Sequence, residues 1–570
     1  MKSLSALALM LASQCAVAQS YTATPLPFSV GGRDTVGGTP INNAGQVVGF
    51  GPAVAGVGSG SGSTGSTGST GSASSASGTG GTSGTSGTSG TSGVDGFEYS
   101  SGRLSVLGHS LIPIAINDAG QITGTSEAAA PMAFLYSNGK LTPVGTLGSY
   151  SEPHNDTPID YSFAHGINAR GQIIGRSSSR EGEAPFLYDT AIAALHLGQS
   201  AIAHGVNDGG SITGEFFAVP GRFHAFLYRA GAVTDLGTLG GPQSFGNAIN
   251  GANLITGTSD TAGGPRNAFL YSEGTMKDLG SLYGSGSAGY AINKAGQVVG
   301  LSHGSTAGRT APSTATLWSG GKAIDLNATL AHPLPGDTTL IQAIGINDRG
   351  AIVANAKDGA KVTAYVLTPV PPLMLACPTA AGETGVAYGA ALIAVGGEPP
   401  YLFSTTGPLQ GLTLNPRSGA LQGAPSGEGS FSFTARVVDS NRAAQGTATI
   451  NCTVDIEPPA YQLKVFPPSY SFGDAAPFRL LHNTFTLMNT GIRTLIIGRP
   501  SVTLKEGAHR TDFTATSLCR AALAPGKSCR IDVVVFTREA GPLSATLNIP
   551  SNAAGSPLTV DLDVDVIEPR

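Results

Sequence analysis

The nine residues Ile167-Asn168-Ala169-Arg170-Gly171-Gln172-Ile173-Ile174-Gly175 decide how this chain folds, because close copies of them recur along its first two thirds. Seven copies are found, and they begin at Ile41, Ile116, Ile167, Val206, Ile249, Ile292 and Ile346. A short run of aromatic and aliphatic residues follows each copy, at positions 97–99, 134–136, 186–188, 226–228, 269–271, 316–318 and 365–367. Self-similarity of this kind is the signature of a repeat architecture.

The spacing of the copies indicates which architecture. Their asparagines are separated by 75, 51, 39, 43, 43 and 54 residues, and the first interval contains a tract of 36 residues, positions 58–93, built almost wholly from Gly, Ser, Thr and Ala. We expect this tract to be a disordered loop. A period of about 40 residues with four short strands is typical of a β-propeller blade. The sequence therefore predicts a seven-bladed propeller over residues 19–368, with an open β-solenoid as the alternative.

Each copy has the chemistry of a tight turn between two strands. The Asn side chain bonds back to the nearby backbone, and the Gly three residues later accepts a positive φ. The fifth copy carries Asn253 in place of this Gly, and Asn is the next residue most tolerant of that conformation. The flanking runs are β-branched and aromatic, as strands prefer, and no window has a sustained helical period. The sequence therefore predicts an all-β chain.

The ends of the repeat region predict how it closes. The seventh unit stops at Thr368-Pro369-Val370, after its aromatic strand, and lacks the further strand that the other units carry. The segment from Tyr21 to Leu26 precedes the first copy, where such a strand would fall. We therefore expect this N-terminal segment to complete the last sheet and to leave no open edge.

The repeat resembles a known family. The fourth unit reads His224-Ala225-Phe226-Leu227-Tyr228, followed by residues 235–241, Asp-Leu-Gly-Thr-Leu-Gly-Gly. Over residues 21–370 the units resemble the bacterial extracellular HAF repeat family, which implies a secreted bacterial protein and brings no established activity. Other units replace the His, for example with Met132 or Asn267.

The N-terminus has the pattern of an export signal. Lys2 is followed by an apolar run at residues 4–11 and by Ala16-Val17-Ala18, an A-x-A cleavage site. Residues 1–18 are therefore predicted to be a signal peptide; Cys15 suggests a lipoprotein anchor instead, but Gln14 stands where a lipobox needs a small residue. No later stretch is apolar enough to span a bilayer, and no sorting tail precedes Arg570. We expect a secreted or cell-surface protein, with the periplasm as the alternative.

Two further domains are predicted after a stiff linker at residues 369–372. Residues 373–457 and 461–570 both contain short alternating apolar runs bounded by Gly, Pro or Asn, as β-sandwiches do. They hold the four cysteines that remain after removal of the signal peptide: Cys377, Cys452, Cys519 and Cys529. An even number of cysteines in an exported chain suggests disulfides, with three pairings open and zinc as the weaker alternative.

Both domains also resemble known families. Residues 373–457, with Gly396-Gly397-Glu398-Pro399-Pro400-Tyr401, resemble the Ig-like, cadherin-like domain of bacterial surface proteins. Residues 461–570, with Leu487-Met488-Asn489-Thr490-Gly491, resemble the choice-of-anchor D, Hydin-type Ig-like domain. The resemblance implies two sandwiches that act as spacers or docking modules. It pairs Cys377 with Cys452, near the first and last strands, and Cys519 with Cys529, where the second family has its local pair.

Composition and motifs exclude several function classes. Only 12% of residues are charged, the formal net charge is −5, and no Lys/Arg stripe is present, which argues against nucleic-acid binding. Two strings satisfy G-x-G-x-x-G, at residues 60–65 and 284–289, but neither joins a strand to a helix as a nucleotide site requires. No zinc-protease motif, P-loop or nucleophile elbow occurs. Three carboxylates recur on equivalent strands: Asp235, Asp278 and Asp325. Roles in turns or at strand edges suffice to explain them.

These observations favour a non-catalytic binding or scaffold protein, whose propeller recognises an extracellular glycan or protein. The alternative is a polysaccharide-active enzyme, a glycoside hydrolase or lyase, with two carboxylates at one mouth of the propeller channel. No cofactor is predicted. Calcium at Asp439-Ser440-Asn441 is considered, but calcium needs about six or more oxygen ligands, and an Asx turn accounts for these residues.

One strand position suggests a binding site. The residue two positions before each Ile-Asn or Val-Asn pair varies more than its neighbours; these residues are Thr39, Ile114, His165, His204, Asn247, Tyr290 and Ile344. If this strand is the innermost of each blade, their side chains ring the central channel, and His165 lies near His204. We single out His165, His204, Asn247 and Tyr290 as candidate ligand contacts. A plain hydrogen-bonded channel lining is the alternative.

Overall fold

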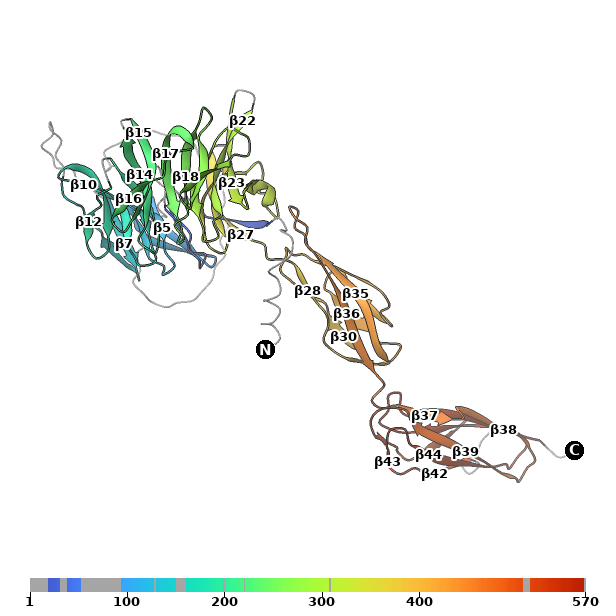
Figure 1. The fold of residues 1–570 in the computed structure, drawn as a ribbon. Coiled ribbons are helices and arrows are strands. Elements are labelled where there is room, and N and C mark those ends of the chain that lie inside the picture. Colours follow the sequence, from blue (N-terminus) through green and yellow to red (C-terminus); the bar gives the residue numbers. More distant parts are fainter. Residues whose placement is uncertain are drawn as a thin grey trace, which may run out of the picture. The chain divides into compact units, whose positions relative to one another are not determined.

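The computed structural model describes residues 19–30, 38–52, 94–127, 130–149, 160–197, 200–219, 221–306, 309–505 and 513–567. Within these ranges the regular structure is β-strand, apart from the 3-10 turn η2 (Leu326–Thr329). The chain is therefore all-β, as predicted. Contacts divide it into two units, residues 1–370 with 441–444 and residues 371–440 with 445–570 (Figure 1). The predicted signal peptide and the Gly/Ser/Thr tract at 58–93 lie outside the described residues.

The first unit consists of small antiparallel sheets that follow one another along the chain. Each repeat contributes one sheet, and within each of the first six sheets the strands lie in sequence order. The first sheet has three strands, β2 (Val47–Pro52), β3 (Val94–Ser100) and β4 (Arg103–His109). The next two have four strands each: β5 (Leu111–Ile116), β6 (Ile122–Ser126), β7 (Met132–Ser137) and β8 (Lys140–Pro143), then β9 (Ser162–Ile167), β10 (Ile173–Ser179), β11 (Gly182–Tyr188) and β12 (Ile192–Ala194).

The fourth, fifth and sixth sheets repeat this four-stranded pattern. Their strands are β13 (Ile202–Val206), β14 (Ile212–Val219), β15 (Arg222–Arg229) and β16 (Ala232–Asp235); β17 (Gly240–Ile249), β18 (Ile255–Thr261), β19 (Asn267–Ser272) and β20 (Thr275–Gly280); and β21 (Ser287–Ile292), β22 (Val298–Thr306), β23 (Arg309–Ser319) and β24 (Lys322–Asp325). The first strand of each sheet lies at one edge.

The seventh sheet combines the two ends of the repeat region. Its order is β1 (Tyr21–Pro25), β27 (Lys361–Pro369), β26 (Ile352–Asp358) and β25 (Thr339–Ile346). β1 pairs antiparallel with β27, from Tyr21 opposite Pro369 to Pro25 opposite Tyr365 (Figure 1). The N-terminal segment thus occupies the place that the sequence assigns to it, as the fourth strand of the last sheet.

The cores of these sheets explain the aromatic strand of each copy. Its Phe is almost completely buried in four consecutive units, at Phe134, Phe186, Phe226 and Phe269. Burial of such a side chain stabilises a fold by roughly 1.5–3 kcal/mol. Because these rings pack against residues of a neighbouring unit, each short sheet gains a core that it lacks alone.

The second unit begins with a sandwich that spans the first of the two predicted C-terminal domains. One sheet has the order β29 (Gly382–Glu383), β36 (Thr447–Glu457), β35 (Gly429–Val438) and β32 (Leu402–Thr406). The others are β30 (Tyr388–Ala391), β34 (Ala420–Gly423) and β33 (Leu412–Leu414), and the pair β28 (Met374–Ala376) and β31 (Ile393–Val395). A disulfide joins Cys377 to Cys452, the pair that the resemblance implies.

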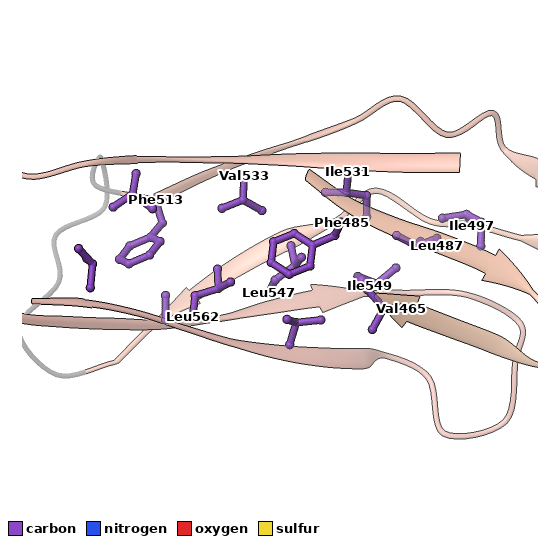
Figure 2. Packing of buried hydrophobic residues seen from close by; sticks show 14 of the residues in the cluster. Val465, Phe485, Leu487, Ile497, Phe513, Ile531, Val533, Leu547, Ile549 and Leu562 are labelled. Carbon is purple, nitrogen blue, oxygen red and sulfur yellow. The ribbon is translucent and has the colours of Figure 1, made fainter. Parts of the chain in front are cut away.

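The last sandwich packs two four-stranded sheets over one apolar core. One sheet has the order β37 (Leu463–Phe466), β39 (Leu480–Asn489), β44 (Ser528–Phe536) and β42 (Phe513–Ser517); the other is β38 (Ser469–Ala475), β46 (Leu558–Val566), β45 (Gly541–Ile549) and β41 (Ser501–Leu504). Phe485, Ile531 and Leu547 are fully buried between them (Figure 2). A further pair, β40 (Leu495–Ile496) and β43 (Ala522–Leu523), lies beside a disulfide between Cys519 and Cys529.

No helix that is long and apolar enough to cross a membrane occurs among the described residues. The two disulfides are consistent with an extracellular protein, because such bonds persist in oxidising compartments.

Candidate functional site

The asparagine of each copy organises a turn through its side chain. In the third unit the Asn168 Oδ1 atom accepts hydrogen bonds from the backbone amides of Arg170 (3.1 Å) and Gln172 (3.0 Å). Gly171 has φ +81°, as the turn requires. At the same position of the fifth unit Asn253 has φ +61°, so this substitution preserves the turn, as the sequence predicts.

The same asparagines connect each unit to the next, which the sequence does not reveal. Asn42 Nδ2 donates to the Asn117 carbonyl (3.0 Å), and Asn347 Nδ2 donates to the Asn42 carbonyl (2.9 Å), 305 residues away in sequence. The five intermediate bonds run in the same direction, from Asn117 to Asn168, Asn168 to Asn207, Asn207 to Asn250, Asn250 to Asn293 and Asn293 to Asn347. These seven bonds form a closed cycle of buried asparagines, which we call the asparagine ring.

Two units compensate for each other within the asparagine ring. In the first three units and the sixth, the second Nδ2 hydrogen of the ring Asn is donated to a Gln of the same copy. The fourth unit has Ser211 at the Gln position. There Asn207 Nδ2 donates instead to the Oδ1 atom of Asn253 (2.9 Å), the residue that replaces Gly in the fifth unit. The one exceptional turn residue thus supplies the acceptor that its neighbour lacks.

The candidate channel residues occupy β-bulges. In six units the pairing of the first strand with the second skips one residue, and the skipped residues are Ile114, His165, His204, Asn247, Tyr290 and Ile344. In the first unit the corresponding Thr39 lies beside Pro40, whose carbonyl accepts from the Val48 amide (2.9 Å). A bulge turns a side chain away from its regular direction and is frequent next to binding sites. These are the variable residues that the sequence singles out.

The glycine that ends each copy accommodates the bulge. A Cβ atom on Gly175 would lie 1.9 Å from the Phe163 carbonyl oxygen, and one on Gly214 would lie 1.8 Å from that of Ile202. The first strand therefore places a carbonyl group where a side chain would otherwise stand. The seventh unit has Ala354 at this position, and its first strand contains a second skipped residue, Ile341, beside the equivalent carbonyl group.

The two predicted histidines are neighbours. Their rings are stacked, with centroids 5.5 Å apart and planes inclined by 18°. His165 Nδ1 lies 2.8 Å from the Ala203 carbonyl oxygen, and His204 Nε2 lies 2.6 Å from Glu215 Oε2. Burial, together with the nearby His204, lowers the pKa of His165 to about 3. His165 is therefore neutral at physiological pH, and its Nδ1 atom is the donor to the carbonyl.

Asn247 and Tyr290 make contacts of the same kind. Asn247 Nδ2 donates to the Gly289 carbonyl (2.7 Å), as His165 donates to Ala203, so each bonds the residue just before the next bulge. Burial raises the pKa of Tyr290, whose hydroxyl group bonds the Gln342 side chain of the seventh unit. The four predicted residues thus join successive units. Within the described part of the chain, the rings of His165 and His204 also contact each other directly.

The asparagine ring opens into a cavity of about 170 Å³ lined by residues from all seven units. Three carboxylates border it, and the sequence does not single them out. Asp118 accepts from the Asn43 amide (2.8 Å), Asp208 from the Ala169 amide (2.8 Å), and Asp348 from the Lys294 amide (2.8 Å). Each Asp directly follows a ring Asn. The residue at this position varies between copies, and this variation is the sequence signal that could have identified the three carboxylates.

Two of these carboxylates lie close together. Asn43 Nδ2 donates to Asp118 Oδ2 (2.8 Å) and to Asp348 Oδ2 (3.0 Å). The shared donor keeps these two carboxylate oxygens no more than about 6 Å apart.

The recurrent carboxylates on the outer strands have turn roles. Asp235 accepts from the Gly237 amide (2.8 Å) and contacts His224 Nδ1 (2.9 Å). Asp278 makes the equivalent pair of contacts with the Gly280 amide and the Asn267 side chain. The His of the His-Ala-Phe motif and its Asn replacement therefore have the same structural partner. Asp325 bonds the Asn327 amide at the start of η2.

The remaining sequence motifs are accounted for by backbone contacts. Residues 284–289 run into β21, so a strand and not a helix follows this motif. Residues 60–65 lie outside the described ranges. Asp439 accepts from the amides of Gly446 (2.7 Å) and Glu398 (3.1 Å). Asn441 Oδ1 accepts from the amides of Ala443 and Ala444, which is an Asx-type turn.

Comparison with known proteins identifies no family. No family model matches the chain, and no curated protein matches it. Among solved structures, an endo-fucoidan hydrolase of glycoside hydrolase family 107 is 15% identical, with a TM-score of 0.19, over 42% of this chain and 38% of that chain. Mouse cadherin-23 EC22-24 is 14% identical, with a TM-score of 0.19, over 39% of this chain and 75% of that one. Domains 4 and 5 of the S-layer protein SbsC are 16% identical, with a TM-score of 0.14, over 35% and 98%.

Likenesses this slight carry no argument about function. The chain spans well under half the length of the fucoidan hydrolase that it matches.

Proposed function

We propose that residues 19–368 form a closed seven-bladed β-propeller of the HAF repeat type. Two observations support closure: β1 pairs with β27 in the seventh sheet, and the asparagine ring returns from Asn347 to Asn42. Both contacts join the first unit to the last, and in an open solenoid these two units lie at opposite ends and do not meet.

We propose that this propeller is the recognition platform of a secreted or cell-surface binding and scaffold protein. The observation that carries the proposal is the cavity at the asparagine ring, where all seven units present residues around one opening. Carboxylates such as that of Asp208, which accepts a hydrogen bond from a backbone amide through Oδ1, are groups that hydrogen-bond sugar hydroxyls. The two sandwiches, which resemble cadherin-like and choice-of-anchor D domains, act as spacers or docking modules. The ligand class we favour is an extracellular glycan.

Binding of the full chain to a panel of bacterial and host polysaccharides tests this proposal. We expect saturable binding to at least one glycan, and weaker binding by Asp208→Ala. The matched control is Glu181→Ala, which removes an exposed carboxylate from the hairpin between β10 and β11. Glycan binding that survives Asp208→Ala, Asp118→Ala and Asp348→Ala together would place recognition elsewhere. Absence of glycan binding would leave a protein ligand as the occupant.

The second candidate function is polysaccharide cleavage, and the Asp118–Asp348 pair is the observation that favours it. A retaining glycosidase uses two carboxylates about 5–5.5 Å apart, one as nucleophile and one as acid. Release of reducing ends from the glycan that binds, abolished in both Asp118→Asn and Asp348→Asn, would support this function. Binding without any release would favour the recognition platform.

A further inference from the structure

Two arginines in the last sandwich directly follow the two cysteines of one disulfide. Arg520 directly follows Cys519 and Arg530 directly follows Cys529, and a disulfide joins these cysteines with their Cα atoms 5.0 Å apart. The Leu518 amide also donates to the Arg530 carbonyl (2.9 Å). The two cationic segments therefore lie side by side, whichever way the side chains turn.

Neither guanidinium is neutralised by a carboxylate of the described residues. Asp532, the acidic residue nearest along β44, instead accepts a hydrogen bond from the Thr484 hydroxyl (2.6 Å). By contrast, Arg266 Nε in the repeat region lies 2.7 Å from Asp260 Oδ1. Two like charges placed together without a counter-ion repel each other, so the arrangement favours an anion between them.

The arginines border a hollow of about 410 Å³. Its other walls combine apolar and hydroxyl groups: Leu518, which is 62% exposed, Ala522, Leu523 and Ser528. Guanidinium groups bind carboxylate and sulfate oxygens through paired N–H donors. The hollow therefore offers charge, directed donors and an apolar surface in one place.

The outer face of the neighbouring strands extends this surface. Across β37, β39 and β44, Phe466 is opposite Thr486 and Thr486 is opposite Arg530; in the next row Lys464 is opposite Met488 and Met488 is opposite Ser528. Phe466 is 53% exposed. An exposed aromatic ring on the same face as the cations suits a sugar ring that carries an acidic group, because the aromatic ring packs on the sugar face while the cations bind the acid.

We propose that this hollow, the Arg520–Arg530 site, binds the acidic groups of an anionic polysaccharide, either sulfate esters or uronate carboxylates. The site lies in the C-terminal sandwich and does not depend on the function proposed for the repeat region. The exposed Phe466 is the observation that favours a polysaccharide over an acidic peptide.

The test measures binding of the full chain to heparin, polygalacturonate, neutral dextran and poly-glutamate. Heparin presents sulfate and polygalacturonate presents only carboxylate, so their relative affinities identify the acidic group. We expect the double variant Arg520→Gln/Arg530→Gln to bind the preferred acidic polysaccharide about tenfold or more weakly. The matched control, Arg479→Gln/Arg499→Gln, removes two exposed arginines of the same domain that do not line the hollow, and we expect it to bind within about twofold of the unmodified chain.

Several outcomes overturn the proposal. The unmodified chain could fail to bind either acidic polysaccharide, or it could bind poly-glutamate more tightly than both of them. The control variant could weaken binding as much as Arg520→Gln/Arg530→Gln does, or the latter could leave binding unchanged. Far-ultraviolet circular dichroism of both variants establishes that the substitutions leave the sandwich folded.

Discussion

Closure of the asparagine ring makes a quantitative prediction, because two of its members have the same contacts but different positions in the chain. Asn347 donates to the Asn42 carbonyl and accepts from the amides of Arg349 and Ala351. Asn250 donates to the Asn293 carbonyl and accepts from two amides of its own turn. Both are buried, at 5% and 7% exposure. The first joins the two ends of the repeat region, whereas the second joins consecutive units.

Replacement by alanine removes three hydrogen bonds at either site. Each contributes about 0.5–1.5 kcal/mol net, so we expect Asn347→Ala and Asn250→Ala each to lower the free energy of unfolding by about 1.5–4.5 kcal/mol. Replacement by aspartate is a more specific test. It keeps the side-chain oxygen that accepts the two amides of the turn, and it replaces only the Nδ2 donor between units with a charged oxygen. A buried, unpaired charge costs about 3–5 kcal/mol. If the ring is closed, Asn347→Asp and Asn250→Asp lose stability equally.

The single tryptophan makes the measurement specific. Trp318 is 2% exposed and lies in β23 of the repeat region, so its fluorescence during urea unfolding reports this region and not the sandwiches. An open ring would leave the carboxylate of Asn347→Asp in water. Stability of that variant within about 0.5 kcal/mol of the unmodified chain, with Asn250→Asp strongly destabilised, would refute ring closure.

Three further predictions concern packing, pH and the disulfides. Gly214→Ala should lower the free energy of unfolding by about 1–3 kcal/mol through overpacking, whereas Gly251→Ala, which has open space around its Cα atom, should change it little; equal effects in urea unfolding would contradict the bulge argument. The pKa of His165 is about 3 in the folded chain and has an ordinary value of 6.5, so between these pH values the unfolded chain binds a proton that the folded chain does not. The contribution of His165 to the free energy of unfolding is therefore complete above pH 6.5, and it falls by up to about 1.4 kcal/mol per pH unit below that pH. Urea titrations at several pH values should show this slope, and His165→Gln should remove it. Loss of the Cys377–Cys452 bond, which closes 75 residues, should destabilise its sandwich by about 4 kcal/mol; calorimetry of Cys377→Ser/Cys452→Ser should show a lowered transition for that domain while Trp318 unfolding stays unchanged.

Local chemistry made much of the fold predictable. An Asn, a Gly three residues later and flanking β-branched residues specify a hairpin wherever they occur, and Asn253 obeys the rule with φ +61°. The missing strand of the seventh unit identified the partner of β1. Contacts between units were not predictable, because the Asn207–Asn253 bond depends on how one sheet lies against the next. The adjacency of His165 and His204 was predicted from their equivalent positions, but Glu215 beside His204 was not.

The residues of the candidate site were harder to predict because adjacent positions of the repeat have different roles. A ring asparagine such as Asn168 donates both Nδ2 hydrogens and accepts two amides, so a ligand gains no bond from it without breaking the turn. The residue after each ring asparagine takes no part in the Asn-centred turn, and the seven copies carry Asn43, Asp118, Ala169, Asp208, Gly251, Lys294 and Asp348 there. A fixed ring with variable neighbours makes an opening of constant shape but unequal chemistry around its rim. Such an opening suits the recognition of an asymmetric ligand by a repetitive fold, and for that reason we propose the site at the rim and not at the histidines.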